Sequence, residues 1–238
     1  MQERHNGGSV GNRLLDALAP SGRDEILNES PLIPLERSKI LAAKGERSDR
    51  VYFPVDGVIS IMTSADDGVW VESATIGNEG MLGIAVFLGT ETWGNSEAIV
   101  QVPGSAYAMR ADRFRAALGS KGKLYELVAA YTQALFAQIS QSVACNGRHA
   151  IEQRTARWLL QTSDRMHSER FALTQEYLAV MLGVRRPSVS VAAKALQEAG
   201  LITYSRGSIT ILDRPGLERV SCGCYDAVRA EYERLVPL

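Results

Sequence analysis

Apolar and polar positions follow two different periods along this chain, and the change between them divides it into three parts. Over residues 38–109, short runs of β-branched and aromatic residues recur between turn signals. Short strands at regular spacing are typical of a β-sandwich or β-barrel. The predicted strands are VYF at 51–53 before Pro54, VISIM at 58–62, VWVESATI at 69–76 and EAIVQV at 97–102 before Pro103-Gly104. Two short helices, over 12–19 and 22–27, are predicted before them, separated by Pro20 and Ser21.

A helical period replaces the strand pattern between residues 124 and 143, where no glycine or proline occurs. Apolar residues recur there at intervals of three or four, which predicts a helix of about 20 residues and roughly 30 Å. The stripe consists of Leu124, Val128, Tyr131, Leu135, Ile139 and Val143, widened by Leu127, Ala134 and Phe136. Asn146-Gly147 is expected to end the helix and form a hinge. Because a near-heptad stripe suits a two-fold helix pair, we predict that this helix joins two copies of the chain.

Residues 173–212 predict a helix-turn-helix followed by a two-stranded wing. Thr174 is a good N-cap for the first helix, and Gly183 suits the left-handed conformation that ends a helix. The second helix opens with Arg186-Pro187, because proline is favoured in the first turn. Its buried face is predicted at Val189, Ala192, Ala193 and Leu196. After Gly200, apolar runs at 201–204 and 209–212 flank a hairpin turn.

The second helix leaves a polar, basic face outside its apolar stripe, which favours contact with the major groove of DNA. Arginine can bind guanine O6 and N7 with two hydrogen bonds, and serine can reach a base edge or a phosphate. Thr174, Gln175 and Arg206 of the wing are expected to contact phosphates, which position a protein without specifying sequence. The candidate DNA-binding residues are Thr174, Gln175, Arg185, Arg186, Ser188, Ser190, Lys194 and Arg206.

The distribution of charge supports that interpretation. The 238-residue chain has a net charge of −1, but residues 148–212 hold nine Lys/Arg and five Asp/Glu, a net charge of +4. Phosphate neutralisation depends on this local charge. No run of about 18 apolar residues marks a membrane span, and residues 1–18 lack the apolar segment of a signal peptide. With only three cysteines, the protein is expected to lie in a reducing compartment, the cytoplasm.

The order of a β domain, a connecting helix and a winged helix-turn-helix resembles the CRP/FNR family of bacterial transcription regulators, from about residue 35 to residue 212. The specific part is LTQEYLAVMLGVRRPSVSVAAKALQEAGLI, which is similar to the family's helix-turn-helix and places Arg186 where the family commonly has a base-reading arginine. GVISIMTSADDGVWVESATIG and NEGMLG are similar to the family's barrel strands and to the start of its ligand cassette. The resemblance implies a homodimer that binds palindromic double-stranded DNA near promoters, with RNA polymerase as a partner and no membrane.

The resemblance also implies an α+β fold, with an N-terminal cyclic-nucleotide-binding-like β-barrel (jelly roll), a long dimerisation helix and a C-terminal winged helix-turn-helix. The expected parts are an N-terminal arm with short helices over 1–29, the barrel sensor domain over 30–120, the dimerisation helix and hinge over 121–147, and the DNA-binding domain with a C-terminal helix over 148–238.

The ligand cassette departs from that of family members that bind cyclic nucleotides. Those members carry a glutamate just after the glycine and an Arg-Ser pair further on. Here Ile84 follows Gly83, and the arginine position falls at Gly94 or Asn95. Residues 51–109 contain seven acidic residues and no Lys, Arg or His, which makes a poor anion site. We expect that the barrel does not bind cyclic AMP and senses another signal or is vestigial. A cyclic-nucleotide-responsive regulator with an atypical cassette is the alternative.

The cysteines give a weaker signal. Iron–sulfur sensors of the family hold their cluster with N-terminal cysteines. No cysteine precedes Cys145 here, which excludes an iron–sulfur cluster of that kind. Cys222-Gly-Cys224 is a weak thiol or metal signal, and a four-ligand zinc site would need further ligands from Cys145 or the other protomer. No ligand spacing is formed by the three histidines, His5, His149 and His167. We expect free cysteines, no metal and no cofactor, with a thiol or metal sensor using Cys222 and Cys224 as the alternative.

Motifs of enzymes are not found in the sequence. The chain has no G-x-S-x-G, Walker loop, H-E-x-x-H or glycine-rich strand-to-helix motif. The segment Gly77-Asn78-Glu79-Gly80 is predicted to be a turn and not a phosphate-binding loop. We therefore expect a DNA-binding regulator and not an enzyme.

Overall fold

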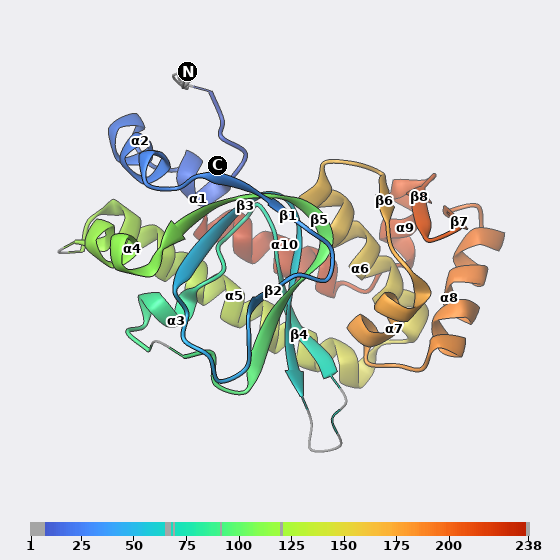
Figure 1. The fold of residues 1–238 in the computed structure, drawn as a ribbon. Coiled ribbons are helices and arrows are strands. Elements are labelled where there is room, and N and C mark those ends of the chain that lie inside the picture. The colour runs from blue at the N-terminus through green and yellow to red at the C-terminus, as the bar shows by residue number, and fades with distance from the viewer. Residues whose placement is uncertain (1–7, 65–67, 69, 91, 120, 237–238) are drawn as a thin grey trace.

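The computed structural model describes residues 8–64, 68, 70–90, 92–119 and 121–236, which form a β domain, a long helix and a C-terminal helical domain (Figure 1). Residues 1–7 of the expected N-terminal arm, and the acidic residues Asp66, Asp67 and Glu91, lie outside the described residues. The elements in chain order are α1 (Arg13–Asp16), α2 (Pro20–Asn28), β1 (Leu32–Leu35), β2 (Ile40–Ala42), β3 (Arg50–Ser64), β4 (Trp70–Ile76), α3 (Ile84–Phe87), β5 (Ser96–Arg110), α4 (Ala111–Leu118), α5 (Lys123–Arg148), α6 (Ile151–Met166), β6 (Arg170–Ala172), α7 (Gln175–Leu182), α8 (Arg186–Glu198), β7 (Ile202–Ser205), β8 (Ser208–Ile211), α9 (Arg214–Val220) and α10 (Cys224–Leu235).

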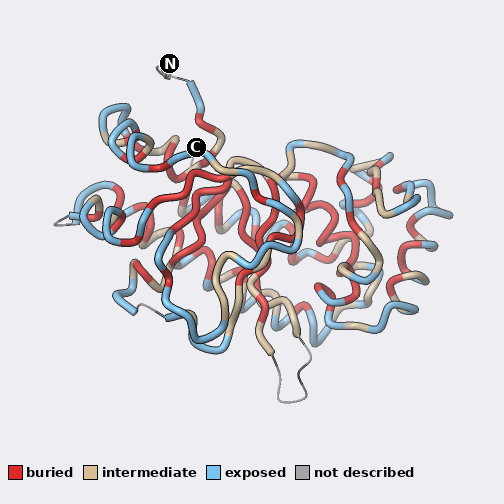
Figure 2. Tube along the Cα trace, in the orientation of Figure 1, coloured by how far each residue is buried: buried red, intermediate tan, exposed pale blue. Residues whose placement is uncertain are grey.

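The β domain is built on an antiparallel sheet with the order β1-β5-β3-β4, and β2 also pairs with β5. This confirms the predicted jelly-roll-like β domain within an α+β fold, although the strand path does not close into a barrel among the described residues. Figure 2 shows that buried segments concentrate in this sheet and in the helices that pack on it.

The two longest strands, β3 and β5, run through the prolines that were predicted to end them. They pair from Arg50 opposite Arg110 to Thr63 opposite Ser96, with register shifts near Pro54. At the shift, Gly57 has a φ of +88°, and a Cβ on Gly104 would lie 2.5 Å from the Asp56 carbonyl oxygen. Two glycines therefore allow a bulge, which tolerates proline, where the sequence predicted turns.

The start of α2 also differs from the sequence prediction. Pro20 was expected to separate two helices, but it is the first residue of α2. Proline fits this position because its missing N–H would have no partner in the first turn.

Helix α5 ends later than predicted. Asn146 and Gly147 lie inside it, and the helix continues to Arg148. The buried Cys145 anchors the last turn, and its carbonyl oxygen accepts a hydrogen bond from the His149 N–H at 3.0 Å. This anchoring offsets the roughly 1 kcal/mol that glycine costs within a helix. The connection to α6 is therefore shorter than the expected hinge.

Most of the apolar stripe of α5 packs within its own protomer. Its first four members, between positions 124 and 135, are buried in the core that also holds Phe53 and Phe114. They are therefore not a free face for a partner helix. Phe136 and Val143, which also belong to the predicted stripe, point away from this core and are each 70% exposed.

The C-terminal domain has the predicted helix-turn-helix and wing. Arg206 and Gly207 form the tip of the β7–β8 hairpin, with φ values of 50° and 75°, as a type I′ turn requires. A third strand, β6, pairs with β8. The sequence did not predict β6, because three residues are too few to show a period. The C-terminal helix α10 packs against α5.

A buried polar network joins the two domains. Arg165 of α6 forms an ion pair with Glu79, in the turn after β4, at 2.7 Å, with side chains only 7% and 9% exposed. The same guanidinium donates a hydrogen bond to Gln138 Oε1 of α5 at 3.4 Å. This oxygen also accepts a hydrogen bond from the Tyr232 hydroxyl of α10 at 3.0 Å. A Cβ on Gly77 would lie 2.4 Å from the Arg165 side chain. The predicted turn at 77–80 therefore holds α6 against the sheet.

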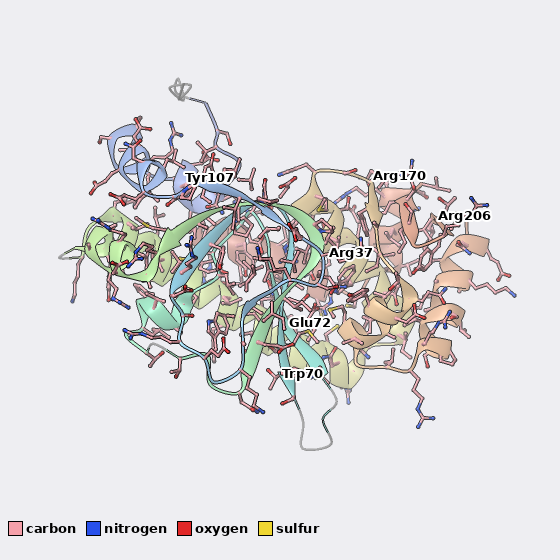
Figure 3. All side chains as sticks on the ribbon, in the orientation of Figure 1. Arg37, Trp70, Glu72, Tyr107, Arg170 and Arg206 are labelled. Carbon is pink, nitrogen blue, oxygen red and sulfur yellow. The ribbon has the colours of Figure 1, made fainter. Side chains whose placement is uncertain are left out.

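A second polar contact between the domains involves Glu72 of β4, which lies between the sheet and the helical domain (Figure 3). Its carboxylate accepts from Ser60 Oγ at 2.6 Å and from Trp158 Nε1 of α6 at 3.1 Å. Burial raises the pKa of Glu72 to about 7, against the opposing effect of these hydrogen bonds and of Arg157 and Arg165.

Candidate DNA-binding surface

Three contacts fix the turn between α7 and α8. Thr174 caps α7, because its hydroxyl oxygen accepts a hydrogen bond from the Tyr177 N–H at 3.3 Å. Gly183 ends α7 in the left-handed conformation, with a φ of 62°. From α6, Arg154 donates to the Leu182 carbonyl oxygen at that end. Both sequence predictions about these caps are confirmed, and the position of α8 follows from them.

Helix α8 buries one face and exposes the other, as its sequence predicts. It begins at Arg186 with proline in its first turn. The buried face consists of Val189, Ala192, Ala193 and Leu196. Arg185, Arg186 and Lys194 are exposed, and Ser188 and Ser190 are half-buried. Figure 2 shows exposed residues along the outer side of this helix.

Val191 is a further candidate that was not included among the predicted contact residues. Its side chain is 71% exposed on the outer side of α8. An apolar side chain in the major groove can contact the methyl group of thymine. Its position outside the predicted buried stripe was the sign in the sequence, because a valine there has no packing role within the domain.

A surface hollow brings four of the predicted residues together. Its walls come from α7, α8 and the wing, and its volume is about 410 Å³. The lining residues are Thr174, Gln175, Glu176, Arg186, Tyr204, Arg206 and Gly207. Arg206 lies at the outer edge of the domain, as does Arg170 (Figure 3). The remaining candidates, Arg185, Ser188, Ser190 and Lys194, do not line the hollow.

Within the hollow, Arg186 makes an ion pair with Glu176 at 3.0 Å. Both side chains are more than 60% exposed, so the pair is worth at most about 1 kcal/mol in water. Ser190 Oγ donates to Gln175 Oε1 at 2.7 Å, which ties the start of α7 to α8. Glu176 was not predicted, since its sequence position carries no sign of which basic residue it faces.

The positive charge of this domain is smaller at the surface than in the sequence. Arg154, Arg157 and Arg165 are each 6% exposed, so three of the nine basic residues counted over 148–212 cannot face DNA. The exposed basic residues are Arg148, Arg170, Arg185, Arg186, Lys194 and Arg206. Burial of an arginine depends on partners that are distant in sequence, and a charge count cannot detect them.

The cassette positions of the β domain hold no anion-binding side chain. Ile84 opens α3 and packs against the core, and Gly83 before it has a φ of 120°. A Cβ on Gly83 would lie 2.6 Å from Val51, so the backbone packs closely on β3. Asn95 donates to the Ser64 carbonyl oxygen at 3.5 Å. These positions therefore lack the glutamate and the arginine that cyclic-nucleotide-binding members carry there.

The three cysteines lie together at the junction of α5, α6 and α10. Cys145, Cys222 and Cys224 are buried, and no disulfide joins them. The structure adds His149, whose ring nitrogen lies within 4.8 Å of the sulfur atoms. The sequence analysis considered only the spacing of His149 from the other histidines, whereas the fold brings it beside cysteines from a distant segment.

Two protein-family models match the sequence. The cyclic nucleotide-binding domain matches residues 32–121, and the Crp-like helix-turn-helix domain matches residues 153–220. Together with the exposed basic face of α8, these matches define a transcription regulator with a DNA-binding helix-turn-helix and an N-terminal domain of the cyclic-nucleotide-binding type. The chain belongs to the CRP/FNR family of transcription regulators.

Solved structures share this fold at low sequence identity. A CRP-family transcriptional regulator from Thermus thermophilus is 17% identical, with a TM-score of 0.66 over 79% of this chain and 96% of its own. FixK2 from Bradyrhizobium japonicum is 16% identical, with a TM-score of 0.63 over 81% and 98%. The c-di-GMP responsive global regulator CLP of Xanthomonas campestris is 13% identical, with a TM-score of 0.64 over 81% and 99%. No curated protein matched the sequence.

None of the described helices is both long enough and apolar enough to cross a lipid bilayer.

Proposed function

We propose that this regulator acts as a homodimer that recognises a palindromic DNA site through α8. The observation that carries the proposal is the hollow in which Arg186 of α8 and Arg206 of the wing lie beside Thr174 and Gln175. In this arrangement the N-terminus of α8 enters the major groove, and Arg186 and the exposed residues after it contact base edges. The side chains of Thr174, Gln175 and Arg206 contact phosphates on either side.

The dimer forms through the side of α5 that is left free by its own protomer. Phe136 and Val143 are each 70% exposed there, and a large exposed apolar side chain on a long helix favours a partner surface. Half-buried or exposed residues recur on this side with heptad spacing at Ala129, Gln133, Phe136, Ser140 and Val143. Two such helices related by a two-fold axis would place two copies of α8 in successive major grooves, about 10–10.5 bp apart or a multiple of that.

The β domain, proposed to span 30–120, acts as a sensor of a signal other than cyclic AMP or as a vestigial sensor. The positions of the anion anchors hold Ile84, packed on the core, and Asn95, bound to backbone. The match to the cyclic nucleotide-binding domain model favours the alternative, a nucleotide-responsive regulator. Calorimetry with cyclic AMP at micromolar concentration distinguishes the two, since saturable binding would contradict our proposal.

The test of the proposed function is selection of bound duplexes from a random DNA library by purified protein, at about 0.15 M salt. If the dimer binds DNA specifically without a ligand, we expect enrichment of a palindrome in the absence of added ligand. If only salt-sensitive, unselective binding appears, selection is repeated with candidate ligands and metals. Failure to enrich any sequence under all of these conditions would contradict the proposal.

A further inference from the structure

Four side chains with metal-binding chemistry meet at the point where α5 ends. The cysteine–histidine cluster consists of Cys145, His149, Cys222 and Cys224. Cys145 is in the last turns of α5, and His149 directly follows this helix. Cys222 lies between α9 and α10, Cys224 is the first residue of α10, and α10 packs on α5. The cluster therefore joins two segments that are more than seventy residues apart in the chain, since Cys145 and Cys222 are separated by 77 positions.

The four ligand atoms of the cluster lie close enough together to surround one metal ion. All four ligand atoms lie within 4.8 Å of one another. The Cys145 and Cys222 sulfur atoms are 3.5 Å apart, and Cys224 Sγ is 3.5 Å from His149 Nδ1. With Zn–S near 2.3 Å and Zn–N near 2.0 Å, a tetrahedron has edges of about 3.5–3.8 Å. The side chains need only small movements to share one ion.

The surroundings of the cluster favour an anionic centre. Arg157 of α6 is 6% exposed, and its Nε and Nη1 atoms have no hydrogen-bond partner. Its charge acts on both Cys145 and Cys222. Three thiolates and a neutral imidazole around Zn²⁺ carry a net charge of −1, which would neutralise this buried guanidinium. Gln141 Nε2 also donates to Cys224 Sγ at 3.0 Å, as residues around metal ligands commonly do.

A simple disulfide explains less of this arrangement. A bond between Cys145 and Cys222 would use two of the four groups and would leave Cys224 and His149 beside each other without a role. Three sulfur ligands and one imidazole are a donor set that zinc prefers, and with all four positions filled by protein the site is structural and not catalytic.

We propose that the cysteine–histidine cluster binds one zinc ion in each protomer. The ion ties the end of α5 to the segment before α10, and so fixes the angle at which the C-terminal domain leaves α5. Because one chain supplies all four ligands, the site needs no second protomer. It also stands independently of the proposed DNA recognition, since none of its ligands lies on α7, α8 or the wing.

The first experiment measures metal content by mass spectrometry of protein purified under reducing conditions without added metal. We expect about one zinc per protomer, lost in His149→Ala and in the double variant Cys222→Ser/Cys224→Ser. His149→Cys should retain the ion, because four thiolates also bind zinc. Asn146→Ala is the matched control: Asn146 is exposed between the first two ligands, and its replacement should leave the zinc content unchanged.

A second experiment uses the wild type alone, so that a folding defect in a variant cannot decide the outcome. Metal-depleted, reduced protein is titrated with Co²⁺, and we expect the intense visible absorption of tetrahedral cobalt–thiolate coordination, followed by displacement by zinc. Protein that contains no zinc and takes up no cobalt at micromolar concentration would overturn the proposal. Zinc that persists in the His149→Ala variant and in the double cysteine variant would do so as well. One equivalent of iron or copper in place of zinc would overturn the assignment of the metal.

Discussion

Arg186 is bound to an acidic neighbour at the place where it would have to meet a base. Its ion pair with Glu176 spans 3.0 Å, and both side chains are largely exposed. Such a pair is weak and screened by salt, while a bidentate contact with guanine is worth about 1–3 kcal/mol. We therefore expect the carboxylate to orient the guanidinium in the free protein without preventing its proposed contact with DNA.

Replacement of Arg186 by alanine should weaken binding to the selected DNA site by about 1–3 kcal/mol and relax the preference at one base pair in each half-site. The measurement is a binding titration at matched salt against the selected site and its single-base variants. Arg113→Ala, on α4 of the β domain and also exposed, is the control and should bind as the wild type does. Unchanged affinity and specificity in Arg186→Ala would remove this residue from the recognition surface.

Glu72 gives the protein a dependence on pH. Burial raises its pKa from 4.5 to about 7 in the folded protein. Between these two pH values, the folded state therefore keeps a proton on Glu72 that the unfolded state releases. The stability from this proton is fully present below about pH 4.5 and is lost as pH rises through 7. Glutamine in Glu72→Gln is neutral at every pH. As pH rises from 5 to 8, the free energy of unfolding of this variant should therefore increase by about 2–3 kcal/mol relative to that of the wild type. Urea unfolding at a series of pH values measures this difference, and parallel curves for the two proteins would contradict it.

At the scale of elements, α5 has two apolar sides with different roles. One side is closed by the core around Phe53 and by α10. The other exposes Phe136 and Val143. The sequence predicted the helix from its period, but it could not show that the first part of the stripe is covered by the protomer's own core, because period alone cannot tell which neighbour covers a stripe.

Phe136→Asp should convert the dimer to a monomer, because burying a carboxylate in a helix pair costs more than the contact provides. Sedimentation or light scattering measures the mass. Ala116→Asp, which introduces the same charge at an exposed position of α4, should leave the mass unchanged. A dimer that persists in Phe136→Asp with wild-type affinity would place the interface elsewhere.

The elements differ in how well the sequence predicts them. The buried face of α8 is confirmed residue by residue, because period, proline and flanking glycines all favour one helix with one buried side. The lengths of β3 and β5 could not be predicted, since Gly57 and Gly104 act together across the sheet. The same holds for the candidate site: its exposed arginines follow from the stripe of α8, whereas Glu176 and His149 acquire their partners only through the tertiary fold.

At the scale of the whole molecule, the domains are joined by the buried pair of Arg165 and Glu79. Glu79→Gln should lower the free energy of unfolding by about 3–5 kcal/mol, because it leaves a buried guanidinium without its counter-charge. Thermal and denaturant unfolding measure the loss. Asp226→Asn makes the same acid-to-amide change in an exposed pair with Arg229 and should cost at most about 1 kcal/mol. Equal losses in both variants would show that burial does not govern the contribution of the Glu79 pair.

Helix α5 has 26 residues, and at 1.5 Å per residue its length is about 39 Å. It starts in the core of the β domain and ends just after Cys145, so it spans the distance between the two domains. A tilt of about 5° at the first end displaces the other by about 3 Å over that length, which is close to the 3.4 Å rise between neighbouring base pairs. In the proposed dimer, a change in packing too small to alter the fold of the β domain would therefore be enough to shift each copy of α8 by about one base pair along the DNA.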